Sequence, residues 1–320
     1  MELINAPGIF EASNPIDRDF LATGILIDRD VPTDDWGWDI LSKLFHVGTK
    51  NIPFEFQPET LAEWAKAYTT HCCETLSKTS PQENSALHAT TSIDLPKPQP
   101  NQTRLNHALQ ARQTSREFNR KAVSLESVAT ILYYTLAYLD RKEDPDEAVL
   151  HPRFGNRRSS PSGGALNATE GYVYVTNVES VTAGVYYYNP THHTLEHRSE
   201  LPVVPLGNML NGQHFVNDIS FGVFFTSRLD KLWWKYEHSR AYRMALIEIG
   251  HLSQTFQLVA TSFGLRTWLT GALNEKPIEQ LINSPFEREE VMFFVGAGYG
   301  SNASVPSVLK AELARQIKDE

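Results

Sequence analysis

Residues 236–263 of the chain read YEHSRAYRMALIEIGHLSQTFQLVATSF, and they hold its longest helical pattern. Apolar residues recur there every three or four positions, which places them on one face of a helix: Ala245, Ile249, Leu252, Phe256, Val259 and Phe263. Gly264 follows directly and is typical of the residue that ends a helix, because glycine adopts a left-handed conformation without strain. The sequence therefore predicts one long helix, from Tyr236 to Phe263, that packs against a core.

Strand patterns lie on both sides of this helix. They are rich in β-branched and aromatic residues, and they read EGYVYVTNV (170–178), GVYYYNPTHHTLEHR (184–198), ISFGVFFTSR (219–228) and EVMFFVGAGYG (290–300). The second pattern is expected to be a hairpin that turns at Asn189–Pro190. Residues 267–271, directly after the long helix, are expected to form a loop or a short strand. Together these patterns predict an α+β fold with a mainly antiparallel central sheet wrapped by helices.

The N-terminal part of the chain carries two shorter helical patterns. Residues 33–47 are expected to form a helix that Thr33 or Asp34 caps, since short polar side chains accept hydrogen bonds from the first free N–H groups. Residues 58–78 are expected to form a second helix with Pro58 near its start, where proline is tolerated.

A polar, proline-rich segment divides the chain. Residues 79–102 show no sustained period, which indicates a linker. We expect residues 1–100 to be an N-terminal helical extension that docks a partner or wraps a dimer, and residues 101–320 to be a single domain. That domain begins with a helix and turn over 102–118, and a further helix is expected to begin at the cap Ser124.

Composition limits the class of protein. The 320 residues carry a formal net charge of -9, whereas a general nucleic-acid binder needs a basic surface. The only cysteines, Cys72 and Cys73, are adjacent and suit neither a disulfide nor a metal site. His192, His193 and His197 lie around the expected hairpin turn and face solvent there, so no metal is expected. The chain shows no signal peptide and no run of about 18 to 20 apolar residues, so we expect a cytoplasmic protein without a membrane segment.

The first chemical motif is RQTSREF, residues 112–118. Arg112 and Arg116 are four positions apart, which puts them on one face if they end a helix, with the hydroxyl of Thr114 between them. Guanidinium groups match phosphate oxygens in charge and geometry, so this motif suits a phosphate. An ordinary surface helix end with ion pairs would look the same.

The second motif is SSPSGGALN, residues 159–167, which precedes the first expected strand. Two adjacent glycines let a ligand approach the backbone closely, and free N–H groups there can bind a flat heterocycle. A plain turn is the alternative. The chain contains neither a GxGxxG fingerprint nor a Walker A motif, so dinucleotide-binding and P-loop folds lack support.

Together these motifs resemble the nitroreductase-like FMN flavoproteins, and within them the SagB-type azoline dehydrogenases. The resemblance covers residues 105–300 or so and depends on the order of the arginine motif, PSGGAL, the long helix and FFVGAGYG. These enzymes oxidise thiazoline and oxazoline rings in ribosomally made peptides. The resemblance implies the nitroreductase-like fold, bound FMN, a homodimer, an azoline-containing peptide as substrate, and a cyclodehydratase as partner in a synthetase complex.

The resemblance also implies roles for single residues. The positions that match FMN contacts are Arg112, Thr114, Arg116, Pro161, Ser162, Gly163, Gly164, Thr270 and Gly271. Lys235 and Tyr236 match a catalytic pair that precedes the central helix. No basic residue follows the last strand before Lys310, where many nitroreductases carry one, so the phosphate is expected to depend on the arginine motif or on Arg266.

The pair Lys235 and Tyr236 lies in KLWWKYEHSRAYR, residues 231–243. The chemistry of azoline oxidation explains why such a pair is needed. Making an azoline aromatic removes a ring proton and a hydride, and the proton needs a base. A phenol is a weak base at neutral pH unless a nearby cation favours its ionised form, and Lys235 would supply that charge for Tyr236. Neighbouring residues do not share a helix face, so the pair is expected in a loop or a first turn. Arg240 and Arg243 are expected on the same face as Tyr236, where they would bind substrate carbonyls or pair with acids.

Two other functions stay open at this point. A nitro or quinone reductase that draws hydride from NAD(P)H would need no base to deprotonate its substrate. A flavin-free scaffold would only hold a peptide or a cyclodehydratase, and a colourless protein would identify it.

Overall fold

The structure, a computed structural model, describes residues 36–51, 58–77, 103–139, 156–285, 288–301 and 305–319, together with Pro15 and Arg18. The predicted caps Thr33 and Asp34 and the linker 79–102 lie outside these residues. The helices are α3 (Ile40–Gly48), α4 (Leu61–Leu76), α5 (Arg104–Ala111), α6 (Leu125–Leu136), α7 (Leu206–Met209), α8 (Leu229–Lys235), α9 (Arg240–Ser262), α10 (Glu275–Ile282) and α11 (Ser307–Asp319), with short 3-10 turns at Gly163–Ala165 and His214–Asp218. The strands are β1 (Thr169–Val175), β2 (Gly184–Asn189), β3 (Thr194–Ser199), β4 (Phe221–Arg228), β5 (Arg266–Thr270) and β6 (Glu289–Gly298).

The strands form one sheet in the order β3-β2-β1-β4-β6-β5. Each of the pairings between neighbouring strands is antiparallel, which confirms the predicted sheet type. The predicted hairpin is also confirmed, because β2 pairs with β3 after a turn in which the Asn189 side chain accepts hydrogen bonds from the N–H groups of Thr191 and His192. The expected loop or strand after the long helix is the strand β5, at one edge of the sheet.

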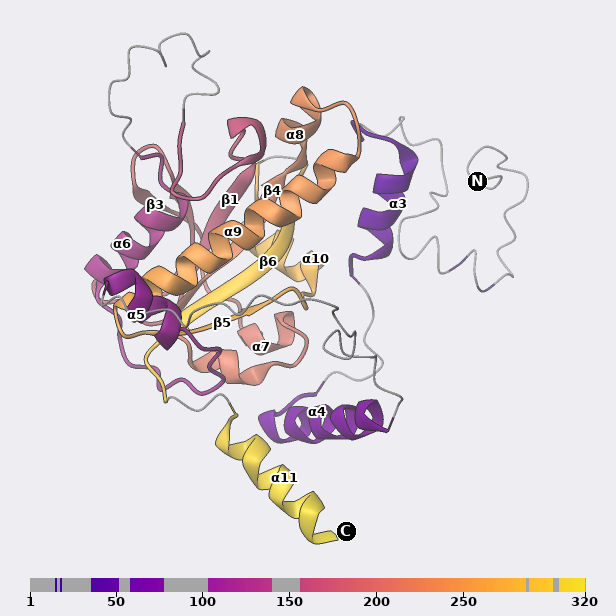
Figure 1. Ribbon diagram of the computed structural model, residues 1–320, viewed down its shortest axis with the longest axis vertical. Coiled ribbons are helices and arrows are strands. Elements are labelled where there is room, and N and C mark those ends of the chain that lie inside the picture. The colour runs from indigo at the N-terminus through magenta and orange to yellow at the C-terminus, as the bar shows by residue number, and fades with distance from the viewer. Residues whose placement is uncertain are drawn as a thin grey trace, which may run out of the picture.

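Helices cover both faces of this sheet (Figure 1). Along β1, side chains alternate between the two faces. Val173 and Val175 pack in a core with α6 and α9, whereas Tyr172 and Tyr174 pack in a second core with α7, α10 and the turn at His214–Asp218. Every residue of β1 is buried, as expected for a central strand with both faces covered.

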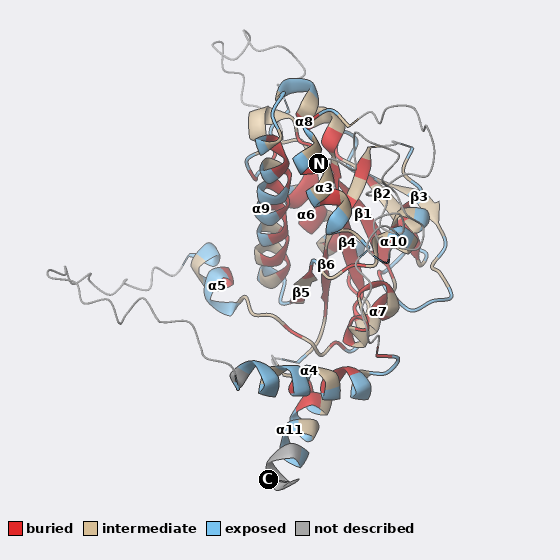
Figure 2. Cartoon of the chain, turned by 90° about the vertical axis from the view of Figure 1, so that its right-hand side faces the viewer, coloured by how far each residue is buried: buried red, intermediate tan, exposed pale blue. Residues whose placement is uncertain are grey.

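Helix α9 crosses the sheet from the α8 end to the β5 end, with its buried side against β4 and β6 and its exposed side outward (Figures 1 and 2). The predicted start at Tyr236 is wrong, since the helix begins at Arg240. Its predicted end is confirmed: Phe263 is the last half-helical residue, and Gly264 has a φ of +75°. Phe263 itself is 41% exposed and does not join the core that the rest of the apolar stripe enters.

The two N-terminal helices contact different parts of the domain. Helix α3 begins at Ile40 because the Asp39 side chain accepts a hydrogen bond from Ser42 N, so the prediction of a helix through residues 36–39 is wrong. It lies beside the α8 and α9 ends, whereas α4 packs against α11 at the opposite end of the molecule (Figure 1). Within the ranges that the structure describes, no helix has both the length and the apolar content that crossing a membrane requires.

Candidate functional site

The predicted catalytic pair lies at a sharp corner between two helices. Lys235 is the last residue of α8, and Tyr236 follows it with extended backbone, φ -120° and ψ 106°. Because Tyr236 is outside both helices, two adjacent side chains can turn to the same side, as the sequence required. The expectation that Arg240 and Arg243 share a helix face with Tyr236 is wrong, since the helix that carries both arginines starts after it and both are exposed.

Both side chains of the pair reach one residue of the glycine motif. Lys235 Nζ donates a hydrogen bond to the Gly164 carbonyl, at 2.9 Å. A Cβ added to Gly164 would overlap the Tyr236 hydroxyl oxygen and would lie 2.9 Å from Lys235 Nζ. The lysine nitrogen is also 5.7 Å from the centre of the Tyr236 ring. We call these three residues, Gly164, Lys235 and Tyr236, the Lys–Tyr corner.

Only glycine fits this position well. Gly164 has a φ of +64°, a left-handed conformation that costs other residues free energy. Its neighbour Gly163 faces α9, where an added Cβ would be 3.4 Å from Met244. The glycine motif therefore lies between the corner and the N-terminal half of α9, and its peptide groups are held close to the side chains of the predicted pair.

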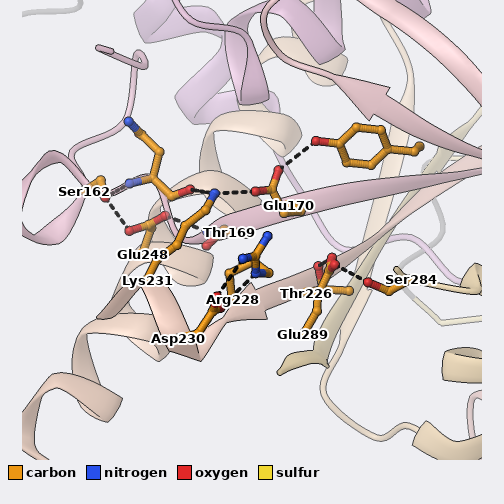
Figure 3. Close-up of polar contacts among 12 residues, drawn as sticks. Ser162, Thr169, Glu170, Thr226, Arg228, Asp230, Lys231, Glu248, Ser284 and Glu289 are labelled. Atoms are coloured by element: carbon orange, nitrogen blue, oxygen red, sulfur yellow. Dashed lines mark hydrogen bonds and ion pairs between the residues drawn. The ribbon is translucent and has the colours of Figure 1, made fainter. Parts of the chain in front are cut away.

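A buried carboxylate fixes the loop that carries the glycines (Figure 3). Glu248 of α9 accepts hydrogen bonds from the Ser162 hydroxyl at 2.6 Å and from Thr169 N at 3.0 Å. The Ser162 oxygen accepts in turn from Asn167 N at 2.8 Å. Glu248 thus ties both ends of the loop to the helix. Sequence reasoning missed it, although an acid inside the apolar stripe of a helix is itself a signal, because a buried charge needs partners.

A second set of polar contacts lies beside this loop (Figure 3). Lys231 Nζ is 2.6 Å from the carboxylate of the buried Glu170, and that carboxylate accepts a hydrogen bond from the Tyr187 hydroxyl at 3.2 Å. Burial and the charge of Glu170 raise the pKa of Tyr187 well above its usual range. Burial also raises the pKa of Glu289, which accepts a hydrogen bond from Thr226. These groups connect α8 with the ends of β1, β4 and β6 that lie nearest the corner. They were not identified from the sequence.

The arginine motif lies at the other end of α9. Helix α5 ends at Ala111, so Arg112 is its cap and residues 112–116 are not helical. The predicted shared helix face of Arg112 and Arg116 is therefore wrong. Instead the segment runs beside β5, where Thr114 pairs with Thr267 and Ser115 N donates to the Thr267 carbonyl at 2.9 Å.

Arg266 lies at the same end of the sheet as the arginine motif. Arg266 begins β5, one residue before the strand position that Thr114 pairs with. Its Nε atom is buried and has no hydrogen-bond partner within the described part of the chain. Buried donors are normally paired, so an orphaned guanidinium nitrogen next to the strand position that pairs with Thr114 suits an anion.

The remaining predicted flavin positions lie at the far end of β5. Thr270 is buried, and its hydroxyl oxygen accepts a hydrogen bond from Ala272 N at 2.9 Å, which fixes the turn out of the strand. Gly271 is exposed, and an added Cβ would be 3.4 Å from Phe293. Both residues thus form a tight turn at the edge of the sheet.

The length of α9 separates the Lys–Tyr corner from the arginine motif within one chain. Met244 lies against Gly163, and Gln257 lies beside Thr267 with their side-chain oxygens 3.5 Å apart. Thirteen residues of helix at about 1.5 Å each make roughly 20 Å between them. Apolar side chains are exposed on the helices of this side, at Leu105 and Leu109 of α5 and at Leu246 and Ile247 of α9.

The donor set at both ends fits FMN. Guanidinium groups with an orphaned nitrogen suit the phosphate, and a glycine backbone that approaches closely suits a flat ring. The ribityl phosphate chain contains seven single bonds of about 1.5 Å each, which reach roughly 10 Å at most. That reach is about half of the separation along α9, so one FMN bound within a single chain would need its ring to span the rest.

Comparison with known proteins gives consistent matches. The model of the nitroreductase family matches residues 109–299. The chain is 28% identical over 145 residues to the trifolitoxin-processing protein TfxB of Rhizobium leguminosarum bv. trifolii, a match that covers 43% of this chain and 39% of TfxB. It is 31% identical over 133 residues to the microcin B17-processing protein McbC of Escherichia coli, which covers 40% of this chain and 48% of McbC. Each match thus spans less than half of the relative's length.

The fold also matches a solved structure. One chain of the E. coli microcin synthetase McbBCD complex, with truncated pro-MccB17 bound, superposes with a TM-score of 0.55 at 21% identity. The superposition covers 82% of this chain and 92% of that chain. The family model covers a smaller part of the sequence, residues 109–299. The common fold therefore extends beyond the residues that the family model matches.

Proposed function

Because the chain belongs to the nitroreductase family, we propose that it is an FMN-dependent dehydrogenase that oxidises thiazolines or oxazolines of a ribosomally made peptide to thiazoles or oxazoles. Its fold is the nitroreductase-like one that the sequence predicted. Support for the substrate class comes from two relatives named for processing of trifolitoxin and of microcin B17. Support for the chemistry comes from the Lys–Tyr corner.

The single observation that carries the proposal is the meeting of Lys235 and Tyr236 at Gly164. Oxidation of an azoline breaks two C–H bonds, and one hydrogen leaves as a proton while the other leaves with both electrons. The Tyr236 phenolate, which the Lys235 ammonium stabilises, takes the proton and becomes the phenol. Lys235 is held for this role by its hydrogen bond to the Gly164 carbonyl. A reductase has no use for such a base.

FMN, when bound, supplies the acceptor for the hydride. In this proposal Arg112, Arg116 and Arg266 bind its phosphate, and Thr114 adds a hydroxyl. The peptide groups from Pro161 to Gly164 contact the ring, as do Thr270 and Gly271 at the end of β5. Ser162 acts indirectly, since its hydroxyl is engaged by Glu248 and holds the loop in place.

The proposed active form is a homodimer. One chain would supply the arginine motif and its partner the Lys–Tyr corner, which accounts for the roughly 20 Å between them along α9 in a single chain. The exposed leucines of α5 and the exposed Leu246 and Ile247 of α9 support this pairing, because apolar side chains on neighbouring helices favour a subunit interface.

The peptide and the other partners belong to the same proposal. The microcin synthetase, one chain of which shares this fold, was solved with a precursor peptide bound. In our proposal a peptide that carries azolines is therefore the substrate, and a cyclodehydratase subunit is the partner protein. Arg240 and Arg243 are exposed on the first turn of α9, close to the corner along the chain. We propose that they contact carbonyl groups of the bound peptide.

The test is oxidation of a defined azoline peptide by the purified protein loaded with FMN. We expect the product to lose two hydrogen atoms by mass spectrometry without added NAD(P)H, with the assay run in air so that dissolved oxygen reoxidises the reduced flavin. Tyr236→Phe should lower turnover by about 100-fold to 10,000-fold, the usual range for a lost general base, and Lys235→Ala should act similarly. Both variants should keep FMN, because neither is proposed to bind it.

Tyr186→Phe is the matched control. It removes a phenol oxygen of β2 that donates to the Thr182 carbonyl, far from the corner in the hairpin, so turnover should be unchanged. Wild-type turnover in both Lys235→Ala and Tyr236→Phe would remove the proposed base. Reduction of nitro compounds or quinones with NAD(P)H, and no azoline oxidation, would favour the reductase instead. A colourless protein that does not take up FMN would favour the scaffold.

A further inference from the structure

The N-terminal segment 36–51 contacts the Lys–Tyr corner directly. The Trp38 indole N–H donates a hydrogen bond to the backbone carbonyl of Tyr236 at 2.8 Å, across 198 positions of sequence. Tyr236 lies between two helices, so its carbonyl is outside both helical ladders. Trp38 is itself buried, at 9% exposure, which makes its bond to Tyr236 a buried one at the donor end. We call residues 36–51 the N-terminal strap.

Aromatic packing seats the strap on α8, next to the corner. The Trp38 and Trp233 rings meet edge to face with centroids 5.6 Å apart, and Trp36 meets Trp233 at the same distance. Gly37 lies so close that an added Cβ would overlap the indole ring of Trp233. Since Trp233 is two residues before Lys235, movement of the strap would move the end of α8.

A polar network holds the other end of the strap. His46 Nδ1 is 2.9 Å from the Tyr242 hydroxyl on α9, and Lys50 forms ion pairs with Glu279 of α10 and Glu290 of β6. Although burial opposes ionisation, the hydrogen bond from His46 and the charge of Lys50 lower the pKa of Glu290 to about 2. Burial also opposes the charge of Lys50, yet its two carboxylate partners raise its pKa. The strap is thus fixed to elements on both sides of the corner.

The strap also completes the start of helix α10. Lys276 N donates to the Asn51 side chain at 3.0 Å, and Asn51 N donates to the Glu275 carboxylate at 2.9 Å. Asn274, which precedes the helix, makes no such cap. Asn51 therefore caps a helix more than 220 positions away in sequence, which indicates that the strap is an integral part of this domain's structure.

We propose that Trp38 is a positioning residue that sets the backbone of Tyr236, and that the N-terminal strap serves to hold the Lys–Tyr corner in its reactive geometry. The effect of Trp38 on catalysis rests on the proposed function. Its effect on the backbone of Tyr236 does not. The Tyr236 hydroxyl can lie over Gly164 only while its backbone keeps its extended conformation between α8 and α9. The Trp38 bond to the Tyr236 carbonyl fixes that conformation from outside both helices.

Hydrogen exchange in the 320-residue chain, without FMN or peptide, tests the structural part. Trp38→Phe keeps an aromatic ring but loses the N–H together with the five-membered ring, and amides of residues 229–240 should then exchange about tenfold faster. Trp36→Phe is the matched control, since its N–H donates to Ser42 within the strap itself and not to the corner. Equal protection in wild type and Trp38→Phe, or an equal change in Trp36→Phe, would overturn the proposal.

A double-mutant cycle on azoline oxidation tests the catalytic part. We expect Trp38→Phe to lower kcat about tenfold with little change in KM, because geometry at the base changes while peptide contacts do not. In a Tyr236→Phe background the same change should have no further effect, since its effect passes through Tyr236. Equal losses in both backgrounds would overturn the positioning role. If no azoline is oxidised at all but exchange responds as expected, the proposed function fails and the structural role of Trp38 remains.

Discussion

At one end of α9, the Lys–Tyr corner is surrounded by contacts from its own chain. Lys235 donates to the Gly164 carbonyl, and Trp38 donates to the Tyr236 carbonyl. Glu248 of α9 accepts a hydrogen bond from Ser162 and so holds the loop that carries the glycines. At the other end, the arginine motif is attached by a backbone bridge to β5, and the Nε atom of Arg266 beside it has no partner among the residues that the structure describes. One end is packed by contacts from its own chain, and the other carries a buried donor that no described residue satisfies.

This difference indicates a division of work between the two ends. A base must be positioned within a fraction of an ångström, and that requires a rigid support from several elements. A phosphate seat needs only charge and donors that converge when the ligand arrives. In the proposed function, the roughly 20 Å of helix between them separates the base from the phosphate site within one chain.

The largest expected effect comes from disturbing the crowded end. Gly164→Ala places a methyl group where the Tyr236 hydroxyl lies, at a backbone φ of +64° that alanine adopts with strain. We expect azoline oxidation to fall at least about 100-fold, because the base and its lysine are pushed apart. Turnover of the peptide is the measurement, with bound FMN followed by its absorbance to separate lost chemistry from lost cofactor.

Gly250→Ala is the control for this substitution. Gly250 lies on the exposed side of α9, where an added Cβ meets nothing within 4 Å. Alanine should stabilise the helix by about 0.5–1 kcal/mol and raise the melting temperature while turnover stays the same. Full turnover in Gly164→Ala would show that the close contact at the corner is irrelevant to the chemistry.

Mixing variants of the two ends tests whether one site uses two chains. Arg112→Ala and Tyr236→Phe each inactivate one end, so each variant alone should be nearly inactive. Co-expressed, about half of the dimers carry one copy of each, and each of these has one intact site of the two, so about a quarter of wild-type turnover should return. The measurement is azoline oxidation by the mixed protein, normalised to its chain concentration.

A pair of variants at the same end is the control. Lys235→Ala mixed with Tyr236→Phe leaves no intact corner in any dimer, so no turnover should return. A return of turnover in this control would contradict a site shared between chains. So would a lack of turnover in the mixture of Arg112→Ala and Tyr236→Phe.

The sheet and the long helix were predictable because their patterns are local. The apolar stripe of α9 and the alternation along β1 record which sides are buried, and Gly264 marks the end of the helix. The glycine motif and the Lys–Tyr pair were predictable by resemblance. Their meeting at Gly164 was not, because it depends on a corner of backbone that ends α8 at Lys235 instead of continuing into α9.

The supports of the site were beyond sequence reasoning for a different reason. Trp38 and Tyr236 are 198 positions apart, and nothing in either local pattern records that contact. Arg112 and Arg116 appeared to be helical because they follow a helical pattern, but pairing of Thr114 with β5 ends the helix before them. In each case a contact between distant segments overrides the local preference.

The last and smallest expected effect concerns acid, which should loosen the corner end first. The folded-state pKa of Glu290 is about 2, below the 4.5 of a free glutamate, so its contribution to stability is complete above about pH 4.5 and is lost as the pH falls toward 2. That shift corresponds to about 3 kcal/mol at most, and less in practice because Glu279, whose pKa is raised by burial, competes for Lys50.

Glu290→Gln removes this titrating group and supplies the measurement. The difference in melting temperature between wild type and Glu290→Gln should be largest above pH 5 and should close as the pH falls below 4.5, since wild type then loses the same charge. Because Glu290 binds Lys50 and His46 of the strap, the loss should appear as faster exchange at residues 36–51 before it reaches β5 and the arginine motif. A melting difference that is constant from pH 7 to pH 3 would mean that Glu290 does not hold the strap. The corner would then have to be supported by the tryptophans alone.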